Sequence, residues 1–180
     1  MDQKQLQISQ FNPKSRDKAH ELLGLLQQIG IEHGESVVRS EIQEDKAQVV
    51  KYLILRSLWP MAIDSYLNDS GWIDQWIKRS QSRPDEAFAD AGVALQRIIE
   101  AGVDPVDVGR MARAVAYYAA FQVLETIDEG YSDEVSDSEI APRWVLMEAD
   151  AQDNLTGRRI GELHALLLQL KPPVREHENG

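Results

Sequence analysis

The hydrophobic pattern is most continuous between Asp104 and Gly130, where apolar residues recur at helical spacing and no proline interrupts them. Asp104 is a typical N-cap residue, Pro105 suits the first helical position, and Gly130 suits the end of a helix. The pattern therefore predicts a helix over residues 105–129, roughly 36 Å long at about 1.5 Å per residue. Apolar side chains lie on nearly all of its sides, so we expect neighbouring helices to enclose it.

Shorter amphipathic segments precede this central helix. Asn12 and Pro13 open a predicted helix that Gly30 closes, and residues 44–58 carry a second apolar stripe. Pro60 should kink the second helix rather than end it, because proline removes one backbone hydrogen bond and crowds the preceding turn. A clean break at this proline is the alternative.

The segment before the central helix predicts a hairpin of two helices. Ser82 and Asp85 resemble a capping box, which indicates a helix start, and Gly102 suits the end of that helix. Because only Val103 separates Gly102 from the N-cap Asp104, the two helices should be antiparallel neighbours. A last helix is predicted over residues 155–170, where Gly157 and Gly161 would permit close packing.

Residues 143–150 form an apolar run that is too short for periodicity to separate a strand from a helical turn. We favour an extended segment, with the lead-in near Leu6 and Ile8 as its partner. The predicted fold class is all-α: a compact bundle of five to seven helices around the central buried helix (about 105–129), with at most a minor β pair near 144–150. A single domain over 1–180 is expected, with flexible tails at 1–11 and 172–180.

Composition and charge narrow the function. Cysteine is absent, which excludes disulfides, thiolate metal sites and cysteine nucleophiles and fits a reducing, cytoplasmic location. The N-terminal residues are polar, unlike a signal peptide, and no apolar run approaches the length of a membrane span. The net charge of −11 repels phosphate backbones, so nucleic acid is not the expected partner, whereas a basic protein would be attracted.

Three residues form the most pointed polar feature of the central helix. Arg110, Arg113 and Tyr117 share a narrow angular band on an otherwise apolar helix. Guanidinium groups suit carboxylate or phosphate, which makes these residues candidates for binding an anion. The alternative, which we favour, is that the arginines pair with acids of the chain, for example Arg110 with Asp107.

Two tryptophans follow the Asn68–Gly71 turn. Trp72 and Trp76 stand one helical turn apart, so their rings lie on the same side of a predicted helix. They could form an aromatic sandwich for a ligand or anchor a dimer interface. We favour the simpler interpretation that they are core residues.

His164 lies toward the apolar side of the predicted last helix, within reach of an acid of the central helix. A buried histidine beside Asp128 would be able to carry protons, which makes His164 and Asp128 the candidate catalytic pair. A core histidine bonded to a backbone carbonyl is the interpretation that we favour.

Metal and cofactor chemistry find little support in the sequence. The chain has no glycine-rich phosphate loop and none of the common hydrolase or zinc-protease motifs. Asp17 with His20, and Glu125 with Asp128, are incomplete halves of a helical metal site. We therefore expect no cofactor and no bound metal.

Two functional hypotheses remain. The first is a non-catalytic acidic interaction protein that regulates or inhibits a basic partner, and a homodimer through Trp72 and Trp76 is one form it could take. The second is an enzyme or small-anion-binding protein with a pocket between the central and C-terminal helices. In that pocket Arg110, Arg113 and Tyr117 would hold the anion while His164 and Asp128 handle protons.

Overall fold

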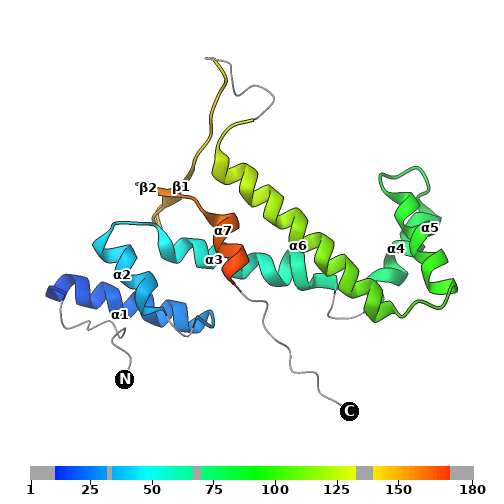
Figure 1. Cartoon of the computed structure of the whole chain (residues 1–180), viewed down its shortest axis with the longest axis horizontal. Helices are drawn as coiled ribbons and strands as arrows, with labels where there is room; N and C mark the ends of the chain where they lie inside the picture. The colour runs from blue at the N-terminus through cyan, green and yellow to red at the C-terminus, as the bar shows by residue number, and fades with distance from the viewer. Residues whose placement is uncertain (1–10, 32–33, 67–69, 133–139, 171–180) are drawn as a thin grey trace, which may run out of the picture. The chain divides into compact units, whose positions relative to one another are not determined.

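A computed structural model of the chain describes residues 11–31, 34–66, 70–132 and 140–170. It confirms the all-α class with a minor pair of strands (Figure 1). Along the chain the elements are α1 (Pro13–Gln28), α2 (Glu35–Gln43), α3 (Gln48–Leu58), η2 (Trp59–Ile63), η3 (Asp64–Tyr66), α4 (Gly71–Ser82), α5 (Ala89–Glu100), α6 (Pro105–Glu129), β1 (Leu146–Ala149), β2 (Leu155–Ile160) and α7 (Leu163–Gln169). Within the described residues, no helix combines the length and apolar character needed to cross a membrane.

The chain divides into two compact units. The first comprises the chain up to Ser57 together with the part from Phe121 onward, and the second comprises Leu58–Ala120. The predicted tails 1–11 and 172–180 fall outside the described residues, except for Phe11, which is buried. In the first unit α1 packs beside α2, around a core of Phe11, Ala19, Leu26, Val37, Val38 and Val49 (Figure 1).

Helix α3 begins four residues later than its apolar stripe predicts. Asp45 adopts a left-handed backbone conformation with φ of 52°, which breaks the helix between Gln43 and Gln48. The carboxylate of Glu41 then accepts the backbone N–H groups of Gln48 and Val49 at 2.7 and 2.8 Å. A buried side chain from α2 therefore satisfies two of the free N–H groups at the start of α3.

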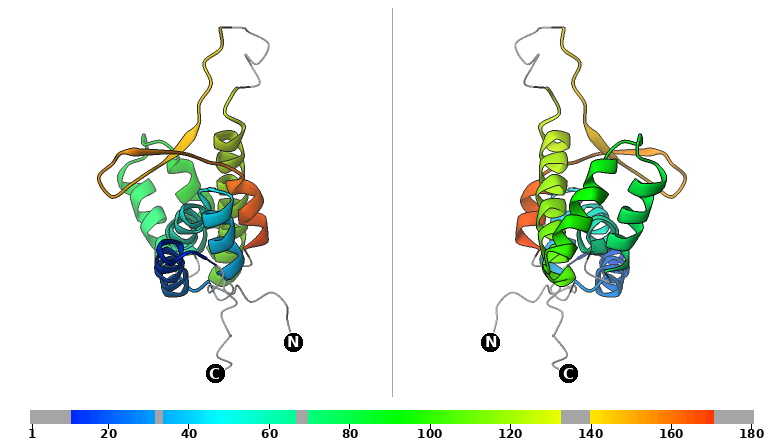
Figure 2. Two further views of the ribbon diagram at one scale, coloured as in Figure 1. Left: turned by 90° about the vertical axis from the view of Figure 1, so that its left-hand side faces the viewer. Right: turned by 90° about the vertical axis from the view of Figure 1, so that its right-hand side faces the viewer.

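β1 is extended as expected. It pairs with β2, antiparallel, with Leu146 opposite Ile160 and Ala149 opposite Leu155, whereas the predicted partner near Leu6 and Ile8 lies outside the described residues. The predicted helix over 155–170 is therefore wrong in its first half, and the β1–β2 hairpin takes its place (Figure 2). Gly157 has φ of +84°, a conformation that a helix does not contain, so its predicted role in close helix packing is also wrong.

In the second unit the chain stays helical across Pro60. The residues around this proline form the π-helical turn η2, and the 3-10 turn η3 follows directly. The helical backbone thus continues past Pro60 as expected, without a clean break, because the wider turn accommodates the proline.

The predicted hairpin of α5 with α6 is wrong: α5 packs against α4 instead. Gly92 allows α5 to pack this closely against α4. A Cβ at this position would lie 2.5 Å from the backbone oxygen of Trp76, so only glycine permits the contact between the two helices. The capping box at Ser82 is wrong as well. Helix α5 begins at Ala89, after Phe88 turns the chain with φ of 66°.

Helix α6 has the predicted bounds, and the Asp104 carboxylate caps it by accepting the Val106 N–H at 2.8 Å. The expectation that neighbours enclose this helix is wrong. Met111, Val115 and Tyr118 are 71%, 67% and 68% exposed, although Val108 and Leu124 are buried. Only one side of α6 is covered by the described residues. Because small residues lie on both its covered and its exposed sides, the apolar pattern did not indicate which side that would be.

Candidate functional site

The two arginines of the predicted anion face are paired with acids of the chain. Arg110 donates to Asp107 at 2.8 Å, and Arg113 donates from Nε to Asp64, which is buried, at 2.7 Å. Tyr117 packs its ring against Trp59 with 5.9 Å between ring centroids. These contacts occupy both guanidinium groups, so an anion site here stays a prediction that the geometry does not favour.

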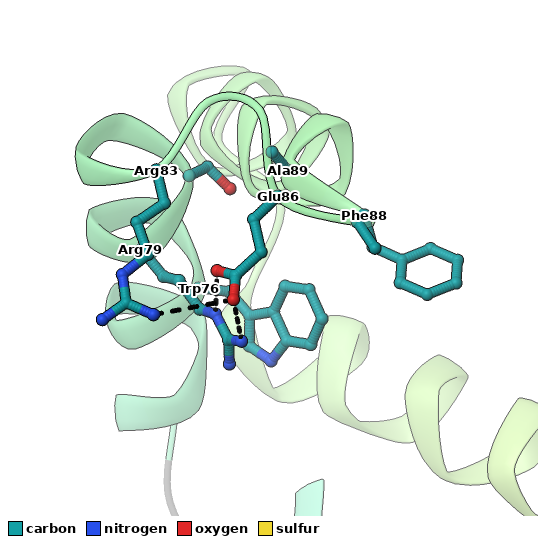
Figure 3. A pocket seen from close by; sticks show the side chains of 8 residues that line it. Trp76, Arg79, Arg83, Glu86, Phe88 and Ala89 are labelled. Atoms are coloured by element: carbon teal, nitrogen blue, oxygen red, sulfur yellow. Dashed lines mark hydrogen bonds and ion pairs between the residues drawn. The ribbon is translucent and has the colours of Figure 1, made fainter.

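The two tryptophans of α4 are both half-buried. Trp72 donates its indole N–H to the Tyr66 carbonyl at 3.1 Å and meets the Tyr66 ring edge to face. Trp76 lines a small hollow beside Arg79 and Glu86, which share two hydrogen bonds of 2.8 Å (Figure 3). These contacts tie Trp72 into the second unit, while a dimer interface through the pair stays a prediction.

The hollow beside Trp76 holds little space, about 10 Å³, which is less than a drug-sized ligand needs. In it, hydrogen bonds from Arg79 lower the pKa of the Glu86 carboxyl. Figure 3 shows Arg83 also directed toward Glu86, whereas Phe88 points away and is exposed. The ion pairs of Arg79 and Arg83 with Glu86 therefore stabilise the turn between α4 and α5.

The candidate pair His164 and Asp128 is brought together by the structure. One carboxylate oxygen of Asp128, Oδ2, lies 2.7 Å from His164 Nδ1 and accepts the His164 backbone N–H at 3.0 Å. The Asp128 side chain is 6% exposed, and its other oxygen has no hydrogen-bond partner among the described residues. The Phe121 ring stands edge-on to the imidazole.

Asp128 borders a hollow of about 340 Å³ in the first unit, but His164 is not among the residues that line it. The lining includes three cations, Lys46, Lys51 and Arg159, and the acid Glu162. An adjoining hollow of about 270 Å³ shares Gln48, Lys51 and Glu162 with the first. The two hollows thus meet at Lys51 and Glu162, between α3 and α7, and we call them together the Lys51 pocket.

Lys51 is a functional candidate that sequence reasoning missed. Its side chain is only 8% exposed, and its ammonium group lies 3.2 Å from Glu162 Oε2. The sequence held one signal: Lys51 interrupts the apolar run from Val49 to Leu55. That signal was indistinct, because a lysine on a helix is ordinarily a solvated residue.

A second missed cluster is structural. Arg158 of β2 donates to Glu148 at 2.7 Å from Nε, and also bonds Glu41, whose side chain is 3% exposed. Burial alone would lower the pKa of Arg158, but the hydrogen bonds to Glu148 and Glu41 outweigh it and raise the pKa. Because the single guanidinium is engaged by both carboxylates, the cluster is suited to holding the hairpin on α2 rather than to binding a ligand.

The suggested metal ligands do not come together. Among the described residues, no group of three or more histidine or acidic side chains could hold a metal ion. Asp17 and His20 on α1 are therefore not joined by Glu125 and Asp128 of α6.

Comparison with known proteins adds no relative to this picture. No family model, no curated protein and no solved structure matches the chain. Two features of this molecule indicate function: the exposed apolar side of α6 and the Lys51 pocket.

Proposed function

We propose that this protein is an interaction module that binds a basic amphipathic helix of a partner protein along α6. The exposed apolar residues Met111, Val115 and Tyr118 carry the proposal. They are spaced by four and three residues, so they form one line along the helix, and the exposed Ala114 stands beside it. We call these four residues the α6 face. Contiguous exposed apolar side chains are typical of surfaces that bind a partner.

The charges at the ends of this line indicate which partner fits. Toward the helix start, the line continues to Asp107, which pairs with Arg110, and to the exposed acid Asp104. Toward the helix end, it continues to Gln122 and Glu125. The line contains no lysine or arginine. A partner helix with an apolar centre and basic ends would therefore match both the apolar middle and the acidic ends.

A second copy of the same helix matches less well. In either orientation it would bring the acidic ends of one copy near the acidic ends of the other. The net charge of −11 adds to this repulsion. We therefore favour a basic partner over a homodimer, in the role of a regulator or inhibitor that works in the cytoplasm, where a chain without cysteine is well suited.

The experiment measures binding of a fluorescent synthetic helix that has leucines at its centre and lysines at its ends. A second peptide carries glutamate in place of each lysine. The double variant Met111→Gln/Val115→Gln should bind the basic peptide about tenfold or more weakly, because each change removes an apolar contact. Met61→Gln is the matched control, because Met61 is 78% exposed and belongs to η2 rather than to the α6 face.

Three results would contradict the proposal. The first is equal binding of the acidic and basic peptides, and the second is an equal loss of binding in Met61→Gln. The third is a homodimer, measured by sedimentation, that dissociates in the double variant. That result would make a second copy the occupant of the α6 face.

A further inference from the structure

We propose that the Lys51 pocket binds a small organic carboxylate, with Lys51 as its anchor. In this proposal Glu162 is an internal carboxylate that the ligand displaces. The site lies wholly within the first unit, so it is independent of the partner site on α6.

Among the described residues, Lys51 is a buried charged group with unused hydrogen-bond donors. An ammonium group has three N–H donors, and burial deprives them of water. Within the described residues, Glu162 is the hydrogen-bond partner of the Lys51 ammonium, at 3.2 Å. A side chain that is 8% exposed therefore carries a charge that one carboxylate compensates, and it retains donors for a second oxygen.

Glu162, the partner of Lys51, is exposed and can be displaced by another carboxylate. The Glu162 side chain is 82% exposed, so its carboxylate is well hydrated when it leaves the lysine. Exchange of this carboxylate for another keeps the buried ammonium group compensated, so the exchange itself costs little. Glu162 also has φ of 60°, a backbone conformation that glycine tolerates better. The chain thus holds a carboxylate over Lys51 at some conformational cost.

The residues around Lys51 make the pocket attractive to an anion. Lys46 and Arg159 line the same hollow as Lys51, in a chain whose net charge is strongly negative. Lys46 is paired with Glu44 at 2.6 Å, so Lys51 and Arg159 are the two cations that a ligand could meet. The other acid of the lining, Asp128, has one oxygen engaged by His164. Displacement of Glu162 would leave the pocket with an excess of positive charge, which an anionic ligand would balance.

The chemical class follows from the group already present. A carboxylate oxygen occupies the position on Lys51, so the site admits that geometry, and a guanidinium such as that of Arg159 suits a planar carboxylate. The hollow of about 340 Å³ falls at the lower end of the range for small-molecule sites. A small mono- or dicarboxylate therefore fits better than a bulky ligand.

The test is an NMR titration of backbone amide shifts with succinate and, separately, with inorganic phosphate, at constant ionic strength. Lys51→Met should weaken succinate binding about tenfold or more, because the anchoring charge is lost while a side chain of similar length remains. Glu162→Gln should tighten binding about threefold or more, because the internal competitor is removed. Lys78→Met is the matched control: it removes the same charge from an exposed position on α4.

The outcomes separate the alternatives. Succinate binding that Lys51→Met weakens and Glu162→Gln tightens supports the site. Binding that is unaffected by Glu162→Gln, or no saturable shift in either the natural protein or Glu162→Gln, overturns it. Phosphate binding without succinate binding overturns the carboxylate class. Should Lys51→Met fail to fold, the direction of the change in Glu162→Gln still decides the question.

Discussion

Asp128 receives two hydrogen bonds from His164 on the same carboxylate oxygen, one from the backbone N–H at 3.0 Å and one from the ring nitrogen Nδ1 at 2.7 Å. An ionised carboxylate only accepts hydrogen bonds, so Nδ1 is the donor in the contact with Asp128. The pair joins the last turn of α6 to the first turn of α7. Because His164 does not line the Lys51 pocket, this pair is suited to positioning rather than to proton transfer there.

Removal of the Asp128 acceptor should destabilise the protein. Asp128→Ala leaves the backbone N–H and the ring N–H of His164 without their partner, at an expected cost of about 1–3 kcal/mol in free energy of unfolding. Asp128→Asn keeps one acceptor oxygen and should cost less. Denaturant unfolding measures both, with the exposed neighbour Glu129→Ala as control. Equal stabilities of Asp128→Ala and Glu129→Ala would refute the positioning role.

The Arg158 cluster should show strong coupling between its members. Arg158→Met leaves the buried Glu41 carboxylate without its cation, and we expect a loss of about 3 kcal/mol in stability. Glu41→Gln in the same chain removes the unpaired charge, while an amide oxygen can still cap α3. The double variant should therefore be more stable than Arg158→Met alone. A double-mutant cycle by chemical denaturation measures this coupling, and simple additivity would contradict it.

The sequence predicted α1 and α6 well because local signals mark their ends. Asn12 caps α1 through its side chain, which accepts the Ser15 N–H at 3.0 Å, and Asp104 does the same for α6. Gly30 and Gly130 both adopt positive φ just past these helices, as their positions suggested. Helix ends that depend on residues within one turn can be predicted from the sequence alone.

β2 was missed because its pattern has two interpretations. Ile160 is buried and continues the apolar spacing of α7, so the run from Leu155 resembles one helix. The inward positions of β2 are in fact Arg158 and Ile160, which alternate as in a strand. Arg158 is drawn inward by Glu41, a residue of α2 that no local pattern connects to it.

In the candidate sites, too, the sequence predicts local contacts but not contacts between residues that are far apart in the chain. The contact of Arg110 with Asp107 is local, and the sequence suggested it correctly as an alternative. The partner of Lys51 is Glu162, which lies far along the chain, so the burial of this lysine could not be derived from helical spacing. The exposure of Tyr118 likewise depends on which side of α6 the fold covers, and an apolar pattern on all sides does not specify that side.

The turn between β1 and β2 should become less stable in acid. Asp150 accepts backbone and side-chain hydrogen bonds from Asn154 and a backbone bond from Gln152, and these lower the pKa of its carboxyl below the ordinary value of 3.8. A lowered pKa means that the contribution to stability is present above about pH 4 and is lost as the pH falls through the lowered pKa.

A carbon-13 NMR titration of the Asp150 carboxyl group measures this effect. Asn154→Ala should raise the pKa of Asp150 toward its ordinary value, because the largest contribution comes from Asn154. The exposed Asp153 of the same turn serves as an internal reference. An unchanged pKa of Asp150 in Asn154→Ala would show that these hydrogen bonds do not form in solution.

Two glycines inside helices should respond in opposite ways to the same substitution. Gly24 of α1 has open space where a Cβ would stand, so Gly24→Ala should stabilise the protein by up to about 1 kcal/mol through helix propensity. At Gly92 of α5 the added Cβ would lie 1.9 Å from Ser80 Oγ and 2.5 Å from the backbone oxygen of Trp76. Because backbone cannot yield as a flexible side chain does, Gly92→Ala should force α5 away from α4 and destabilise by about 1–3 kcal/mol. Thermal unfolding of the two variants measures the contrast, and a stabilising Gly92→Ala would show that the two helices are not in this contact.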